Sequence, residues 1–160
     1  MTKAPNLDAM AAWAADEMCK AIDGKKVSPE EADTAFTKAL AMVQESGIYA
    51  ATIYLQYRSG EKRKLDELKA EEQLACHALS ALVRLLGRKE LGGLGLAFGG
   101  PAEPGDVNGQ KAEMRKHMAG ATDSGLEQVL LVKQLWEQAL TYARYIARGQ
   151  KKGKATGGGA

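Results

Sequence analysis

Residues 46–55 constrain the fold more than any other stretch of this chain. They begin with Ser46 and Gly47 and continue as Ile-Tyr-Ala-Ala-Thr-Ile-Tyr-Leu, so a glycine precedes an almost wholly apolar segment. That segment is too short to span a bilayer and too apolar for a surface helix. We therefore predict that a helix over residues 48–58 is the central and most buried element of the protein, with Ile53 inside the core.

The composition of the 160 residues favours helix and a single globular domain. Alanine is abundant, runs of β-branched residues are missing, and only 6% of the residues are aromatic. The hydrophobic fraction of 45% and the charged fraction of 26% are ordinary for a soluble domain. The chain has neither a run of 18 apolar residues nor a signal-peptide pattern, so we expect a cytoplasmic protein without membrane contact.

Apolar spacing and capping residues predict an all-α fold, a single-domain antiparallel bundle of about five to six helices. Asn6 is expected to cap a first helix that ends near Asp23. The sequence Ser-Pro-Glu-Glu over residues 28–31 has the pattern of a capping box with proline at the first helical position. The predicted helices cover residues 6–23, 28–46, 48–58, 63–86, 111–118 and 122–148.

Two segments are predicted to lie outside the packed helices. Residues 91–110 contain seven glycines and two prolines, so we expect a mobile insertion within a bundle domain of residues 1–149. No predicted strand precedes that insertion and no Gly-Lys-Ser/Thr sequence follows it, which argues against a nucleotide-binding loop. Residues 150–160 are rich in glycine and lysine and are predicted to form a disordered basic tail.

No pattern of catalytic or metal-binding residues stands out. Cys76 and His77 are neighbours on a predicted helix, where their side chains diverge by about 100° and cannot chelate a metal together. Cys19 and Cys76 are expected to be buried and reduced. We predict a protein that is not an enzyme and uses no metal or cofactor, and a small enzyme that uses Cys76 or His77 is an alternative.

The charge is unevenly distributed although the net formal charge is only +2. Residues 58–160 carry 17 basic and 12 acidic side chains, and the last 17 residues carry five basic and no acidic ones. Such a surface suits a polyanion such as RNA, because phosphates need long cationic side chains rather than a particular spacing. A merely solvated surface is the alternative. The predicted RNA-binding residues are Lys133, Arg144, Arg148, Arg84, Arg88, Lys111, Arg115, Lys116, Lys62 and Arg63.

Two stretches of the sequence resemble a known family. Residues 44–55, Gln-Glu-Ser-Gly-Ile-Tyr-Ala-Ala-Thr-Ile-Tyr-Leu, are similar to the central motif of the small helical subunit of type III-B CRISPR effector complexes, the fifth protein of the Cmr module. Residues 139–142 resemble the opening of that family's last helix, and residues 145–148 resemble its close. Ala147 and Gly149 depart from the family pattern.

The resemblance covers residues 6–88 and 120–149 and implies a function. A subunit of this family is non-catalytic, self-associates head to tail as a minor filament beside other CRISPR effector subunits, and contacts crRNA and target RNA. Base pairing then reads the sequence while basic residues hold the backbone. The insertion at 91–110 is not part of the family pattern, which leaves a related type III small subunit open. The alternative outside the family is a helical adaptor or phage structural protein that binds no nucleic acid.

Overall fold

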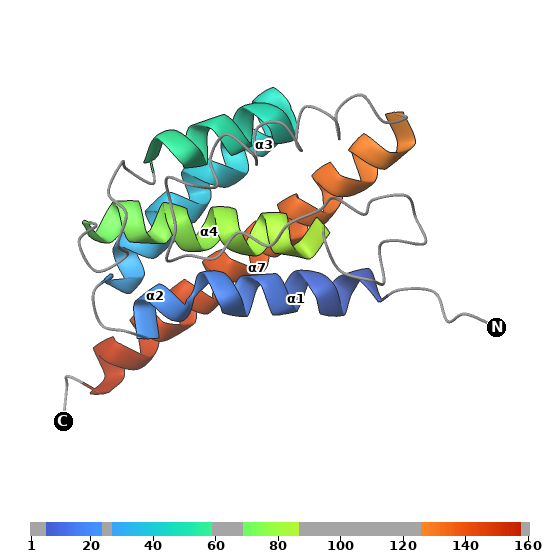
Figure 1. The fold of residues 1–160 in the computed structure, drawn as a ribbon. Helices are drawn as coiled ribbons and strands as arrows, with labels where there is room; N and C mark the ends of the chain where they lie inside the picture. Colours follow the sequence, from blue (N-terminus) through green and yellow to red (C-terminus); the bar gives the residue numbers. More distant parts are fainter. Residues whose placement is uncertain (1–5, 24–26, 59–68, 87–125, 158–160) are drawn as a thin grey trace.

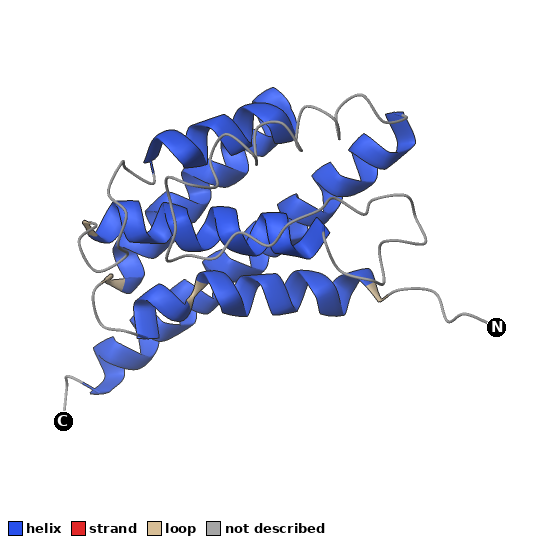
Figure 2. Cartoon of the chain, in the orientation of Figure 1, coloured by secondary structure: helices blue, strands red, loops and turns tan. Residues whose placement is uncertain are grey.

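The computed structural model describes residues 6–23, 27–58, 69–86 and 126–157, and every regular element in these ranges is a helix (Figure 2). The all-α prediction is thereby confirmed for the described part of the chain. The helices are α1 (Leu7–Met18), the single turn α2 (Lys20–Asp23), α3 (Pro29–Arg58), α4 (Ala70–Leu86) and α7 (Leu126–Gly157).

The long helical segments alternate in direction along the chain (Figure 1). The first half of α3 is antiparallel to α1, and its second half is parallel to α1. The next helix, α4, is again antiparallel to α1, and α7 is parallel to it. Both α7 and α4 pack against α1 and α3, so the four helices close a ring around a common core. The described part is thus an antiparallel bundle of four long helices, fewer than the five to six predicted. The predicted helix 111–118 and the insertion 91–110 lie outside the described residues.

The two predicted helix starts have the expected caps. Asn6 Oδ1 accepts a hydrogen bond of 3.0 Å from the backbone N–H of Ala9 in α1. At α3, Ser28 Oγ accepts from the N–H of Glu31, and Glu31 Oε2 accepts in return from the N–H of Ser28. This reciprocal pair satisfies two backbone donors at the start of α3 and confirms the capping box.

Gly47 breaks α3 into two halves, as the sequence predicts. Its backbone has φ 89° and ψ 178°, a region that only glycine adopts without strain. The chain turns back at this residue, so the two halves of α3 lie beside each other instead of forming one rod (Figure 1). A Cβ at this position would meet no atom within 4 Å, so the requirement for glycine is conformational rather than steric.

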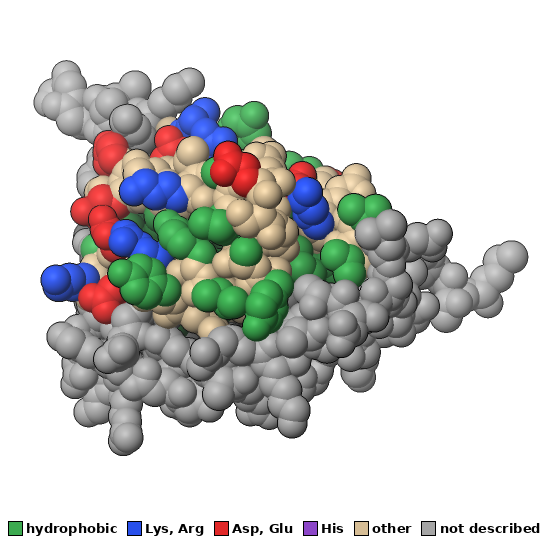
Figure 3. All heavy atoms as spheres, turned by 90° about the horizontal axis from the view of Figure 1, so that it is seen from above, with side chains coloured by type: hydrophobic (Ala, Val, Ile, Leu, Met, Phe, Trp, Pro, Cys, Tyr) green, Lys and Arg blue, Asp and Glu red, His purple; other side chains and the backbone are tan. Residues whose placement is uncertain are grey.

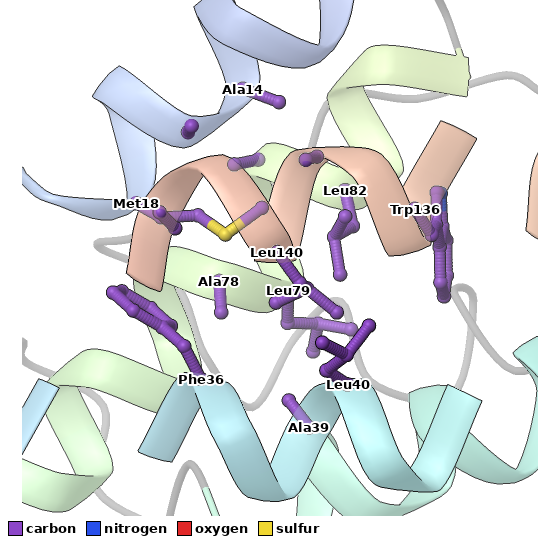
Figure 4. Close-up of a cluster of buried hydrophobic side chains, with 14 of the residues drawn as sticks. Ala14, Met18, Phe36, Ala39, Leu40, Ala78, Leu79, Leu82, Trp136 and Leu140 are labelled. Carbon is purple, nitrogen blue, oxygen red and sulfur yellow. The ribbon is translucent and has the colours of Figure 1, made fainter. Parts of the chain in front are cut away.

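Side chains from all four long helices meet in the core (Figure 4). Trp136 of α7 and Phe36 of α3 are the largest fully buried side chains. Small residues of α1 and α7 complete the core, because alanine lets helix backbones approach closely. The core side chains labelled in Figure 4 are Ala14, Met18, Phe36, Ala39, Leu40, Ala78, Leu79, Leu82, Trp136 and Leu140.

The prediction that residues 48–58 form the most buried helix is wrong. Ile48 and Leu55 face the core, whereas Ile53 is 43% exposed and Tyr57 is 81% exposed. This half of α3 lies at the periphery of the bundle, so only one side of it is covered despite its apolar composition (Figure 1). The largest fully buried side chain, Trp136, belongs instead to α7, which packs against both α1 and α3.

Two predicted helix bounds also differ from the structure. The fourth predicted helix was to begin at residue 63, but Lys69 is not helical and α4 begins at Ala70. At the other end of the chain, α7 continues to Gly157 instead of ending at Arg148 before a disordered tail. Once a helix is formed, each further residue adds a backbone hydrogen bond, so Gly149 weakens the helix without ending it.

Candidate nucleic-acid interface

Two of the predicted RNA-binding residues, Arg144 and Arg148, are neighbours on α7 and contact the same acidic residue of α3. Asp33 Oδ1 accepts a hydrogen bond of 3.4 Å from Nε of Arg144, and its Oδ2 accepts one of 3.1 Å from Nε of Arg148. The two arginines stand one helical turn apart and share this carboxylate. We call Arg144 and Arg148 the arginine pair.

The geometry leaves the arginine pair able to bind an anion. Both hydrogen bonds to Asp33 use Nε, so the Nη groups of each guanidinium lie outside them. The side chains of Arg144 and Arg148 are 24% and 48% exposed, so they reach solvent at the edge of the α3–α7 contact. Two positive charges face one negative charge, which leaves an excess of one positive charge. Arginine Nη groups suit phosphate oxygens because they can donate two parallel hydrogen bonds.

The chain beyond the arginine pair adds positive charge. From Arg144 onward the sequence contains five basic residues and no acidic one, and α7 extends to Gly157 as a continuous helix. Cations at the C-terminal end of a helix also interact favourably with the helix dipole. This end of α7 is therefore the part of the described bundle with the strongest local excess of positive charge by sequence.

The other two described cations on the predicted site lie apart from the arginine pair. Lys133 Nζ is 4.0 Å from Glu137 Oε1 on the same helix, more than two turns before Arg144. Arg84 on α4 stacks over the Trp13 ring at 5.6 Å from its centroid and lies 3.6 Å from Glu17 Oε2. These contacts give Arg84 a role in packing α4 against α1. Among the described residues, Lys133 and Arg84 thus do not join the arginine pair in one basic surface. The remaining predicted residues lie outside the described ranges, namely Arg88, Lys111, Arg115, Lys116, Lys62 and Arg63.

Sequence reasoning missed Asp33, although it organises the arginine pair. Asp33 follows the capping box of α3 and has the appearance of an ordinary solvent-facing acid. Arg144 follows Asp33 by 111 positions and Arg148 follows it by 115, so no local pattern links Asp33 to the arginine pair. A polar contact between α1 and α7 was missed for the same reason: Asp8 accepts from Gln138 Nε2 at 2.8 Å and from the hydroxyl of Tyr142.

His77 faces α1 from α4 and is partly buried. Burial lowers the pKa of His77 below its ordinary value of 6.5, because the imidazolium loses its hydration; Glu17 acts in the opposite direction, and Lys20 reinforces the lowering. Cys19 and Cys76 are both buried and are not joined by a disulfide, and Cys19 Sγ donates to the carbonyl of Ala143. Within the described ranges, no three His, Cys, Asp or Glu side chains come together to hold a metal ion.

A half-open hollow of about 230 Å³ lies between the two halves of α3 and α4. Apolar side chains line it, among them Phe36, Leu55 and Leu74. At its rim Arg58 Nη2 is 2.6 Å from Glu71 Oε2. In the view from above, Figure 3 shows hydrophobic side chains next to charged ones on the described surface. The glutamates at the rim stand in the first turns of α3 and α4, where carboxylates stabilise helix starts.

The second half of α3 exposes an apolar stripe, defined here as Tyr49, Ile53 and Tyr57. These residues recur every four positions and therefore share one helix face. All three rank among the exposed large hydrophobic residues of the described chain. Large contiguous apolar patches are typical of surfaces that contact other proteins.

Comparison with known proteins gave no match: no family model, no curated protein and no solved structure is detectably similar to this chain. The resemblance to type III small subunits therefore rests on its sequence motifs alone. Among the described helices, none combines the length and the apolar character needed to cross a membrane.

Proposed function

We propose that this chain is a non-catalytic small subunit of a type III CRISPR effector complex, and that it holds the RNA backbone through the arginine pair. The carrying observation is that two neighbouring arginines of α7 share the carboxylate of Asp33 through Nε, so that their Nη groups lie outside these hydrogen bonds. The helical bundle and the basic end of α7 are what such a subunit needs. Its partners are then crRNA, target RNA, other effector subunits and further copies of itself.

A single copy offers few phosphate contacts, so its affinity for RNA is expected to be weak. Stacked copies along one RNA act together, because binding of the first raises the effective concentration of RNA at the next. Phosphate contacts release counterions, so the affinity falls steeply with salt. Phosphate contacts carry no sequence information, so this binding should also be independent of the RNA sequence, which distinguishes a backbone-holding subunit from a sequence-reading one.

The test is RNA affinity as a function of salt concentration, measured in the assembled complex by fluorescence anisotropy. Neutralising the pair with Arg144→Gln and Arg148→Gln should lower the affinity and reduce the slope of log K against log salt by about 1.4 to 1.8. Glutamine is preferred to glutamate here, because two glutamates beside Asp33 would repel it. The matched control is Lys20→Gln with Lys38→Gln, which removes the same charge from exposed positions elsewhere.

Equal losses of affinity in both double variants would contradict a specific role for the arginine pair. A complex that contains this protein but no RNA would contradict the CRISPR function altogether. That outcome would favour the second candidate, a helical adaptor that binds only protein.

The apolar stripe is the specific observation behind this second candidate. Tyr49, Ile53 and Tyr57 are exposed on the second half of α3 and remote in sequence from the arginine pair. An adaptor would bind its protein partner there with no dependence on RNA. Ile53→Ser should then abolish assembly, whereas the arginine double variant should leave assembly unchanged.

A further inference from the structure

An exposed tyrosine stands beside the arginine pair. Tyr145 directly follows Arg144 and precedes Arg148 by three residues, and it is 63% exposed. At about 100° per residue, Arg148 lies about 40° and Tyr145 about 100° around α7 from Arg144. The three side chains therefore follow one another from the edge of the α3 contact to the side of α7 that faces away from the core.

Tyr145 has no evident role in the fold. Tyr142, the neighbouring tyrosine on α7, packs against the core and donates its hydroxyl to Asp8. Tyr145 makes no hydrogen bond with any residue that the structure describes, and its ring is mostly in solvent. An aromatic ring beside cationic side chains is the arrangement that proteins use to stack an unpaired nucleic-acid base.

We propose that Arg144, Arg148 and Tyr145 form a subsite for one nucleotide of single-stranded RNA. The Nη groups of the arginine pair hold the phosphate, and the base stacks on the Tyr145 ring. Neighbouring side chains one turn apart on a helix are about 5–6 Å apart at Cβ, a separation that a nucleotide can bridge between its phosphate and its base. The inference rests on the proposed RNA contact of the arginine pair and assigns that contact to an unpaired nucleotide of the bound RNA.

Unpaired RNA is required because a duplex hides the faces of its bases. In an A-form helix each base is covered above and below by its neighbours, and only the backbone and groove edges remain accessible. A duplex can therefore meet the arginine pair but cannot stack on Tyr145. The subsite predicts a preference for single-stranded over double-stranded RNA of equal length, and it predicts that the preference depends on one aromatic ring.

The experiment measures binding of the full chain to a fluorescently labelled single-stranded oligonucleotide and to a duplex of the same length, at low salt. Tyr145→Ala should weaken binding of the single strand about 5- to 100-fold and leave duplex binding unchanged. Its salt slope should equal that of the wild type, because no phosphate contact is lost. Tyr145→Phe keeps the ring and should bind as the wild type does.

Tyr57→Ala is the matched control, since Tyr57 is an even more exposed tyrosine on α3. A loss in this variant equal to that of Tyr145→Ala would overturn the subsite, as would unchanged binding in Tyr145→Ala or an equal loss for the duplex. If Arg144→Gln with Arg148→Gln reduces binding while Tyr145→Ala does not, only the subsite fails. If the arginine variant binds both RNAs as the wild type does, the proposed function fails as well.

Discussion

The carboxylate of Asp33 on α3 lies 3.1 Å from Nε of Arg148 on α7 and so joins two residues 115 positions apart. The same carboxylate also holds Arg144 at 3.4 Å. The arginines that we assign to RNA therefore also contribute to the contact between α3 and α7. Substitutions of the arginine pair must be judged for stability as well as for binding.

The contribution of Asp33 to stability can be measured with double-mutant cycles in urea. Pairing Asp33→Asn with Arg144→Gln should give a coupling free energy of about 0.5–1 kcal/mol. The coupling free energy between Asp33→Asn and Arg148→Gln should be smaller, because Arg148 is more exposed and its charge is better screened. Both couplings should shrink at about 1 M salt.

The ion pair of Lys20 and Glu17 provides the control for these cycles. At 2.7 Å it is the shorter contact, but Lys20 is largely exposed and both residues are close in sequence. Its coupling should be at most about 0.5 kcal/mol. A coupling at Lys20 and Glu17 larger than that at Asp33 and Arg144 would show that distance, rather than burial, determines the contribution.

Local features of the fold could be predicted from the sequence because their causes are local. The caps at Asn6 and Ser28 and the break at Gly47 depend on residues within three positions of one another. The exposure of Ile53 could not be predicted in this way. Whether an apolar helix lies at the centre or the edge depends on which distant helices cover it, and hydrophobicity alone does not contain that information.

The candidate site likewise combines features that the sequence predicts with features that depend on the packing of distant helices. The basic end of α7 and the spacing of Arg144 and Arg148 are visible in the sequence, because residues four apart share a helix face. Their counterion Asp33 is not visible, since it reaches them only through the packing of α3 on α7. Arg84 was predicted as an RNA contact, yet its position over Trp13 gives it a packing role that no spacing pattern would indicate.

Two isoleucines of α3 should respond very differently to truncation. Ile48 is 2% exposed, so Ile48→Ala leaves a cavity and should lower the free energy of unfolding by about 2–4 kcal/mol. Ile53 is 43% exposed, so Ile53→Ala should lower the free energy of unfolding by less than about 1 kcal/mol. Ile53→Asp should likewise remain folded, in contrast to the expectation from sequence. Urea unfolding followed by circular dichroism measures all three, and an unfolded Ile53→Asp variant would contradict the peripheral position of this segment.

Two glycines provide a second matched pair. Gly47→Ala forces a side chain into φ 89° and ψ 178° and should destabilise the protein by about 1–3 kcal/mol, although the Cβ has open space. Gly149 lies inside α7 and also has open space, so Gly149→Ala should stabilise by up to about 1 kcal/mol through its higher helix propensity. Thermal unfolding compares the two variants with the wild type. Destabilisation by Gly149→Ala would contradict the continuation of α7 through this residue.

The partly buried His77 should make the protein less stable as the pH falls below about 6.5. Burial lowers the pKa of His77 in the folded protein, so between 6.5 and that lowered pKa the unfolded chain binds a proton that the folded chain does not. Proton uptake by the unfolded state lowers the free energy of unfolding, and above pH 6.5 the effect disappears because both states are neutral. His77→Gln should therefore lose less stability than the wild type when urea unfolding is compared at pH 7.5 and pH 5.

Glu17 allows a check that the effect belongs to His77. Glu17 raises the pKa of His77 and so opposes the effect of burial. Glu17→Gln should therefore lower that pKa further and steepen the loss of stability between pH 7.5 and pH 5. Adding His77→Gln to this variant should remove the additional loss of stability between pH 7.5 and pH 5. If the additional loss persists in the double variant, the pH dependence belongs to another group.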